Sequence, residues 1–162
     1  MRAFKDLLIK LEACEYAVVW AENKPIEEIV KTCHRGDWLL WLGQKLNLGI
    51  KPMTLAKARC AKTVIHLMKD QRSIDAVNLA ERFGLTDEVT KDDLRAAANA
   101  AHAAAYATNA AANAADAAAN AAHAAYAAAN AAAKTKNQLQ TADICREILG
   151  ELIINAVNEE LK

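Results

Sequence analysis

Apolar residues recur every three or four positions through most of this 162-residue chain, and no stretch alternates apolar and polar residues as a half-buried strand would. This pattern predicts an all-α fold. We expect a single-domain helical bundle of about six or seven helices over residues 1–162. Short amphipathic helices would occupy 1–89, a central long alanine-rich helix 90–138, and a C-terminal helix 141–161.

The N-terminal third of the chain predicts two helices separated by a proline. The first spans about 3–21, and its apolar face carries Phe4, Leu7, Leu8, Leu11, Cys14 and Val18. It ends before Pro25, because proline cannot continue the hydrogen-bond ladder but fits the first turn of a following helix. That second, short helix carries Ile26, Ile29, Val30 and Cys33 on its apolar face.

Helix boundaries further along are predicted from capping residues. One helix spans about 53–69, and Ser73 can cap the next, which Gly84 would end. Thr90 and Asp93 resemble a capping box with aspartate in the glutamate position, so the alanine-rich helix would start near residue 91. Thr141 can cap the last helix, whose predicted inward face contains Ile144, Ile148, Leu152 and Val157.

The run from 96 to 133 is almost entirely alanine, interrupted by single polar residues three or four positions apart. On a helix most of these residues form one stripe, at positions that a coiled coil usually gives to leucine. The stripe contains Asn99, His102, Tyr106, Asn109, Asn113, Asp116, Asn120, His123 and Asn130. Alanine has the highest helix propensity, and its small side chain lets neighbouring helices approach closely. We therefore expect this helix to be flanked by others on both alanine faces.

The sequence leaves open what the polar stripe contacts. One interpretation is a solvent-facing edge. Uncharged amides favour a contact surface instead, because each asparagine costs about 0.6 kcal/mol relative to alanine in a helix interior and gains no ion pair. The contact is then another helix of the chain, a second copy, a polar ligand in a groove, or ice. The candidate partner- or ligand-binding residues are Asn99, His102, Tyr106, Asn109 and Asn113.

The segment CHRGDWLLWL at 33–42 is the most informative stretch outside the tract. Gly36 can take the left-handed conformation that closes a helix, and Asp37 can cap the next one. Capping does not explain the apolar run that follows, which surrounds a helix on all sides and must be covered by the domain or by a partner. The segment is therefore either a turn with core aromatics, or an exposed binding corner made of Arg35, Asp37, Trp38 and Trp41.

Charge and composition argue against nucleic acid and membranes as partners. The 20 lysines and arginines balance the 20 aspartates and glutamates, so no strong field favours nucleic acid or an anionic membrane. The first ten residues are too charged for a signal peptide, and no apolar run approaches the roughly 20 residues of a membrane span. We expect a soluble cytoplasmic protein that binds neither nucleic acid nor membrane.

The four cysteines are widely spaced and each suits an apolar helix position, so we expect reduced core residues. A zinc site of Cys14, Cys33 and His34 lacks the usual CxxC pair. We expect no metal and no cofactor. Histidines 34, 66, 102 and 123 could be combined with aspartates or cysteines into a catalytic pair, but no motif places them together, so we expect no enzyme.

Three features together carry a family resemblance. They are Ala13-Cys14-Glu15 followed by Trp20, the CHRGDWLLWL segment, and a late tract of alanines punctuated by tyrosine, histidine or asparagine. Small bacterial and phage-borne proteins described as immunity proteins have this layout, and the resemblance covers nearly the whole chain. Its RGDWLLWL core is fairly specific, whereas alanine-rich tracts recur by chance. This chain differs in having few tyrosines and many asparagines in the tract.

The resemblance implies a non-catalytic protein, because immunity proteins as a rule bind a toxin or effector tightly. Phage relatives would neutralise a host defence protein or its nucleotide signal. Our leading hypothesis is therefore a binding protein that neutralises a toxin or a defence-system component. The alternative is a small-molecule or nucleotide-signal sponge that uses the polar stripe and basic residues such as Arg35, Arg59 or Arg95, although no glycine-rich phosphate loop is present.

Overall fold

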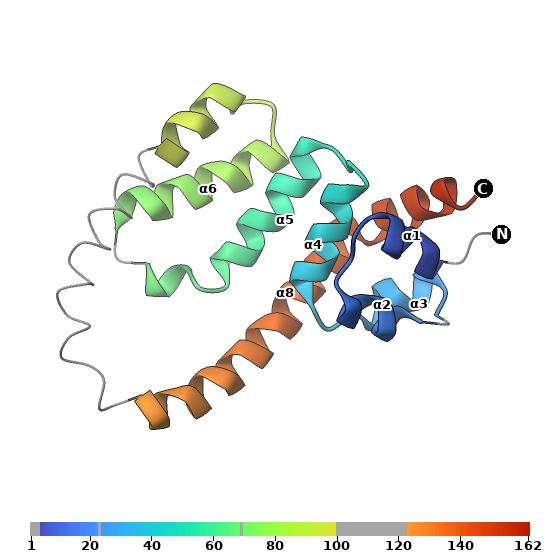
Figure 1. Cartoon of the computed structure of the whole chain (residues 1–162). Helices are drawn as coiled ribbons and strands as arrows, with labels where there is room; N and C mark the ends of the chain where they lie inside the picture. Colours follow the sequence, from blue (N-terminus) through green and yellow to red (C-terminus); the bar gives the residue numbers. More distant parts are fainter. Residues whose placement is uncertain (1–3, 23, 69, 100–122) are drawn as a thin grey trace.

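The computed structural model describes residues 4–22, 24–68, 70–99 and 123–162, with the side chains of the last range described from residue 135. Every regular element in these ranges is a helix, which confirms the all-α prediction (Figure 1). The helices are α1 (Phe4–Lys10), α2 (Glu15–Ala21), α3 (Ile26–Thr32), α4 (Gly36–Lys45), α5 (Ile50–Lys62), the 3-10 helix η1 (Ile65–Leu67), α6 (Gln71–Leu85) and α8 (His123–Glu160). Residues 91–99 are also helical.

The long helix α8 packs against α3, α4 and α5. In Figure 1 it runs diagonally past α4, and its C-terminal end lies near α1. The predicted division into a tract helix ending near 138 and a separate helix from 141 is wrong, because α8 continues through both positions. Thr141 does not cap a helix; its hydroxyl donates to the carbonyl of Gln138, 3.0 Å away, within α8.

The face that α8 buries differs from the predicted one. Its fully buried residues are Ala142, Cys145, Leu149, Ile153 and Val157. Of the predicted inward set only Val157 is among them, and Leu152 is 39% exposed. The segment carries apolar residues on two neighbouring faces, so its periodicity fits either choice. The prediction is wrong because contact with α4 and α5 selects the face that carries Ala142 and Cys145, whose small side chains allow close approach.

The single N-terminal helix predicted over 3–21 is divided into α1 and α2. Glu12 has φ +63°, and the chain around it closes α1 with two hydrogen bonds, from Glu12 N to Ile9 O (3.0 Å) and from Ala13 N to Leu8 O (2.9 Å). This is a Schellman motif, in which glycine is the usual left-handed residue. The sequence gives no stop signal there, because glutamate is a helix former.

Other predicted boundaries also change. The N-cap of α6 is Asp70, whose carboxylate accepts from Arg72 N at 2.9 Å, and Ser73 lies inside the helix. The helix predicted over 53–69 is α5 followed by η1, so it begins three residues earlier and ends at Lys62. The Thr90–Asp93 capping box is present, since Thr90 N donates to the Asp93 carboxylate (2.9 Å) and Asp93 N donates to Thr90 Oγ1 (3.2 Å).

Two glycines that the sequence predicts to end helices make close helix contacts, and α6 does end at Leu85, directly after Gly84. Gly36 is the first residue of α4 and has no positive φ, so the prediction that it closes α3 in the left-handed region is wrong. Gly84 lies inside α6, where an added Cβ would come 2.5 Å from the Cβ of Leu55 on α5. In both places the absence of a side chain lets two helix backbones meet.

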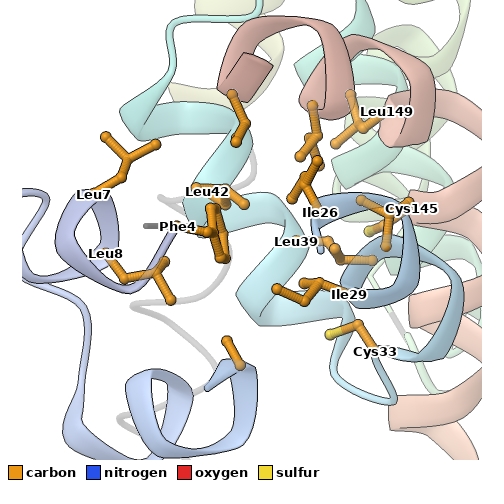
Figure 2. Close-up of a cluster of buried hydrophobic side chains, with 14 of the residues drawn as sticks. Phe4, Leu7, Leu8, Ile26, Ile29, Cys33, Leu39, Leu42, Cys145 and Leu149 are labelled. Carbon is orange, nitrogen blue, oxygen red and sulfur yellow. The ribbon is translucent and has the colours of Figure 1, made fainter. Parts of the chain in front are cut away.

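The core lies where α1, α3, α4 and α8 converge. Figure 2 shows side chains from all four helices directed into one cluster, with Phe4 and Leu8 approaching from α1 and Cys145 and Leu149 from α8. Leu39 and Leu42 of α4 are buried in this cluster. Trp38, Leu40 and Trp41 on the same helix are only half-buried, so α4 divides its apolar run between core and surface.

The cysteine predictions hold in part. Cys33 and Cys145 are buried and Cys60 is half-buried, but Cys14 is exposed, so its assignment to the core is wrong. Cys14 precedes α2, which turns away from α1 at the Schellman motif, and the predicted helical face therefore does not extend to it. Within the described ranges no cluster of three or more His, Cys, Asp or Glu side chains is placed to hold a metal ion.

Residues 100–122 lie outside the described residues. The predicted continuity of the alanine-rich helix over 91–137, and its flanking by helices on both faces, therefore stay predictions. In the part of the chain that the structure describes, no helix combines the length and apolarity that crossing a bilayer requires.

Candidate functional site: a tryptophan surface

The three tryptophans of the chain line one small apolar cavity at the surface. Trp20 comes from the last turn of α2, and Trp38 and Trp41 come from adjacent turns of α4. All three are half-buried and pack against the core cluster. The cavity has a volume of about 30 Å³. We call Trp20, Trp38 and Trp41 the tryptophan surface.

His34 joins this surface from the loop between α3 and α4. Its ring centroid lies 5.8 Å from that of Trp20 and 5.9 Å from that of Trp38, and the two tryptophans are 5.8 Å apart. The interplanar angles are 71°, 61° and 56°, so the rings meet edge to face or tilted, as their quadrupoles favour. These contacts hold α2 against the start of α4.

Each tryptophan also has a cation over its ring. Lys24 Nζ lies 3.9 Å from the Trp20 centroid, and the Arg35 guanidinium carbon lies 4.9 Å from the Trp38 centroid. Lys45 Nζ lies 5.8 Å from the ring of Trp41. Such contacts contribute about 0.5–1 kcal/mol each at exposed sites. The apolar rings are therefore bordered by positive charge.

Lys24 is fixed by the end of α2. Its ammonium donates to the carbonyl of Trp20 at 2.7 Å, one of the carbonyls that a helix C-terminus leaves without an intrahelical partner. A cation is favoured there by the helix dipole as well. The same contact that caps α2 thus places a positive charge over the Trp20 ring.

Arg35 is fixed by Asp37 in a two-pronged contact. Arg35 Nε donates to Asp37 Oδ1 at 2.8 Å, and Nη2 donates to Oδ2. The Arg35 guanidinium lowers the pKa of the Asp37 carboxyl, chiefly through this hydrogen bonding. The sequence predicted Asp37 as the N-cap of α4, and this prediction is wrong. Arg35 occupies that position and makes no side-chain cap bond. The carboxylate instead holds the guanidinium near the Trp38 ring.

An exposed apolar strip on α2 extends the tryptophan surface. Tyr16 is 83% exposed and Val19 is 63% exposed. Tyr16 lies one helical turn before Trp20 on α2, and Val19 is three positions after Tyr16 on the same exposed strip. Large apolar side chains this exposed are ordinary when single, but here they adjoin partly exposed indoles. The combination is typical of an interaction surface.

The structure brings together one of the two predicted groups of site residues. Arg35, Asp37, Trp38 and Trp41 lie together on and before α4, as expected. Asn99 is exposed on the 91–99 helix. The other predicted stripe residues named as ligands, His102, Tyr106, Asn109 and Asn113, lie outside the described residues.

Sequence reasoning missed Trp20, Lys24 and His34, and also the bordering Lys45 and the exposed Tyr16 and Val19. Trp20 entered only through the family resemblance, and nothing in the sequence places it beside residues fourteen to eighteen positions further on. Folding of α2 and α3 onto α4 creates that neighbourhood. A usable signal was the pairing of the only tryptophan outside the CHRGDWLLWL segment with a lysine four residues later.

Comparisons of this chain with protein-family models, with curated proteins and with solved structures found no significant match.

Proposed function

We propose that this chain is a non-catalytic binding protein that neutralises a toxin or a component of a defence system by direct contact. The observation that carries the proposal is the tryptophan surface, bordered by Lys24, Arg35 and Lys45 and extended by Tyr16 and Val19. Tryptophan, tyrosine and arginine are the residues most enriched among those that dominate binding energy at protein interfaces. The resemblance to immunity proteins supports the same conclusion.

The shape of the surface favours a protein partner over a small molecule. The hollow of about 300 Å³ beside Glu15, Tyr16 and Val19 is open and is lined by the single helix α2. Sites for drug-sized ligands usually enclose about 300–1,000 Å³, whereas the cavity between the tryptophans measures about 30 Å³. That volume suits part of one inserted apolar side chain. The surrounding half-exposed rings offer a broad contact, so binding would depend on area and on a few anchoring aromatic groups.

Co-purification from the native host tests the proposal. Tagged full-length chain is compared with Val19→Asp and Arg35→Glu, which place a carboxylate in the apolar strip and reverse the charge over Trp38. Leu67→Asp is the matched control, because Leu67 on η1 is 68% exposed and lies outside the tryptophan surface. We expect the parent and Leu67→Asp to recover the same partner, and the two surface variants to lose it at least tenfold.

A protection assay supplies the functional readout. Cells that express the parent or Leu67→Asp should survive the toxin, or support a phage that the defence system otherwise blocks, and cells with Val19→Asp should not. No recovered partner together with no protection would contradict the function. Full recovery with both surface variants would contradict the site.

A further inference from the structure

Cys60 and Cys145 face each other across the contact between α5 and α8. Their sulfur atoms are 3.7 Å apart, although 85 positions separate them in the sequence. Both thiols are free. The pair is not part of the tryptophan surface, although Cys145 Sγ lies 3.5 Å from the carbonyl of Gly36 at the start of α4. It has no role in the proposed binding function.

The two sulfurs lie near backbone carbonyls, and Cys33 and the Arg146 guanidinium are also close enough to affect the pKa of Cys145. Cys60 Sγ lies 3.8 Å from the carbonyl of Thr141, and Cys145 Sγ lies 3.5 Å from the carbonyl of Gly36. Cys145 is fully buried, whereas Cys60 is half-buried. Cys60 is therefore the more exposed member of the pair.

The more exposed thiol, Cys60, is also the more acidic of the two. A hydrogen bond with Cys145 lowers the pKa of the Cys60 thiol. Hydrogen bonding to Cys60, together with burial, raises the pKa of the Cys145 thiol. Because the thiolate is the nucleophile in thiol–disulfide exchange, Cys60 is the member that attacks first and Cys145 the member that resolves.

We propose that Cys60 and Cys145 form a redox modification site, which closes to an intramolecular disulfide by exchange with a low-molecular-weight disulfide. A disulfide requires sulfur atoms about 2.05 Å apart, so the two must approach by about 1.7 Å. The proposal requires rotation of the two cysteine side chains to supply this movement. Oxidation would link α5 covalently to α8 and enclose residues 61–144, which include the alanine-rich tract.

The exchange balances in two steps. The Cys60 thiolate attacks one sulfur of the small disulfide RSSR, whose S–S bond breaks, and a Cys60–S–S–R mixed disulfide forms as RS⁻ leaves. Cys145 then gives up its proton and its sulfur attacks Cys60 Sγ, which forms the Cys60–Cys145 bond and releases the second RS⁻. Two protein thiols are oxidised, one RSSR is reduced, and the two thiol protons end on the released thiolates.

Cys14 and Cys33 provide the internal comparison. Cys14 is exposed, so it would form mixed disulfides and intermolecular links that obscure the result. Cys33 is buried, and burial raises the pKa of its thiol. Its sulfur contacts the carbonyl of Arg35 at 3.3 Å. We therefore use Cys14→Ser as the background and Cys33→Ser as the matched control.

The experiment treats the folded, full-length Cys14→Ser chain with oxidised glutathione, blocks remaining thiols, and maps tryptic peptides without reduction. We expect a linked pair of peptides 60–62 and 137–146 and the loss of two of the three remaining thiols. Cys33→Ser should leave the link unchanged. Absence of the link in the folded parent, or a link through Cys33, would overturn the proposal.

Single variants test the order of the steps. In Cys145→Ser, Cys60 should accumulate as the glutathione adduct, because no resolving thiol follows it. In Cys60→Ser, Cys145 should stay unmodified while the chain is folded, as judged by circular dichroism. Modification of Cys145 in that folded variant would overturn the assignment of Cys60 as the attacking thiol.

Discussion

Gly36 lies directly against the backbone of Thr141, so that a Cβ at Gly36 would come 2.6 Å from both the carbonyl carbon and Oγ1 of Thr141. This contact places the first turn of α4 on α8, where Cys145 Sγ also approaches the Gly36 carbonyl. The position of α4 then determines which of its faces reaches the core and which carries Trp38 and Trp41.

Gly36→Ala should therefore destabilise the protein by about 3 kcal/mol, because the clash is with backbone that cannot move without separating α4 from α8. Chemical denaturation measures the change in the free energy of unfolding. Gly150→Ala is the control, because the added Cβ would meet only a methyl group of Val30, at 3.2 Å. Alanine also has a higher helix propensity than glycine. Equal effects of the two substitutions would contradict the close crossing at Gly36.

The buried face of α8 can be tested with two leucines three positions apart. Leu149→Ala should cost about 2–5 kcal/mol, because Leu149 is fully buried and its removal leaves a cavity. Leu152→Ala should cost less than about 1 kcal/mol, since that side chain already contacts solvent. Both changes in the free energy of unfolding are measured from the shift in denaturant midpoint, provided that the m-value is unchanged. A larger loss for Leu152→Ala would support the face predicted from the sequence.

Glu12→Gly should stabilise the chain by about 1 kcal/mol, because glycine removes the Cβ strain of the left-handed conformation. The ion pair that Glu12 makes with Lys45, at 3.7 Å and largely exposed, contributes little against this gain. Glu15→Gly, inside α2, is the matched control and should destabilise. The midpoint of thermal unfolding at neutral pH should rise in Glu12→Gly and fall in Glu15→Gly. A loss of stability in Glu12→Gly would be evidence against the Schellman motif.

The Arg35–Asp37 contact predicts a pH dependence in acid. Because the folded state lowers the pKa of Asp37, the stability it contributes is present above the unfolded pKa, about 3.9, and is lost as pH falls through the folded pKa. Asp37 is 56% exposed, so the contribution at neutral pH should not exceed about 1 kcal/mol. The free energies of unfolding of the parent and of Asp37→Asn, measured between pH 7 and pH 2, should converge below about pH 4. A difference that grows in acid would contradict this sign.

Tryptophan fluorescence offers a direct check of how the site is exposed. Acrylamide should quench the folded chain to an intermediate degree, because Trp20, Trp38 and Trp41 are each half-buried. Arg35→Ala should increase quenching through loss of the guanidinium over Trp38, and Lys57→Ala, on the exposed side of α5, should not. Quenching as weak as in a buried core would contradict the proposed surface.

The sequence predicted well what depends on neighbouring residues. The helical class follows from apolar periodicity, and the capping box at Thr90 follows from two residues three positions apart. The break between the first and second predicted helices follows from Pro25. The sequence also indicated a candidate site at 35–41, because five consecutive large apolar residues cannot all be buried by one side of a helix; its binding role stays a prediction. None of these conclusions requires knowledge of residues far away in the chain.

Where the predictions were wrong, a distant part of the chain decided the outcome. Gly36 was read as a helix stop because nothing in its own segment reveals the Thr141 backbone 105 positions later. The inward face of α8 was misassigned because two neighbouring faces are apolar, and only contact with α4 and α5 chooses between them. Likewise, the division of α1 from α2 at Glu12 opposes local helix propensity.

By itself, then, the sequence determined that the chain is helical, where several helices begin, and that the tryptophan-rich segment is distinctive. Only the tertiary structure decided which faces are buried, that Trp20 and His34 join Trp38, and that Cys60 meets Cys145. The physical reason is that backbone hydrogen bonding and capping act within about four residues. Packing instead selects which of several apolar helix faces is buried. That choice is settled by close contacts, such as the one between Gly36 and Thr141, that local patterns do not encode.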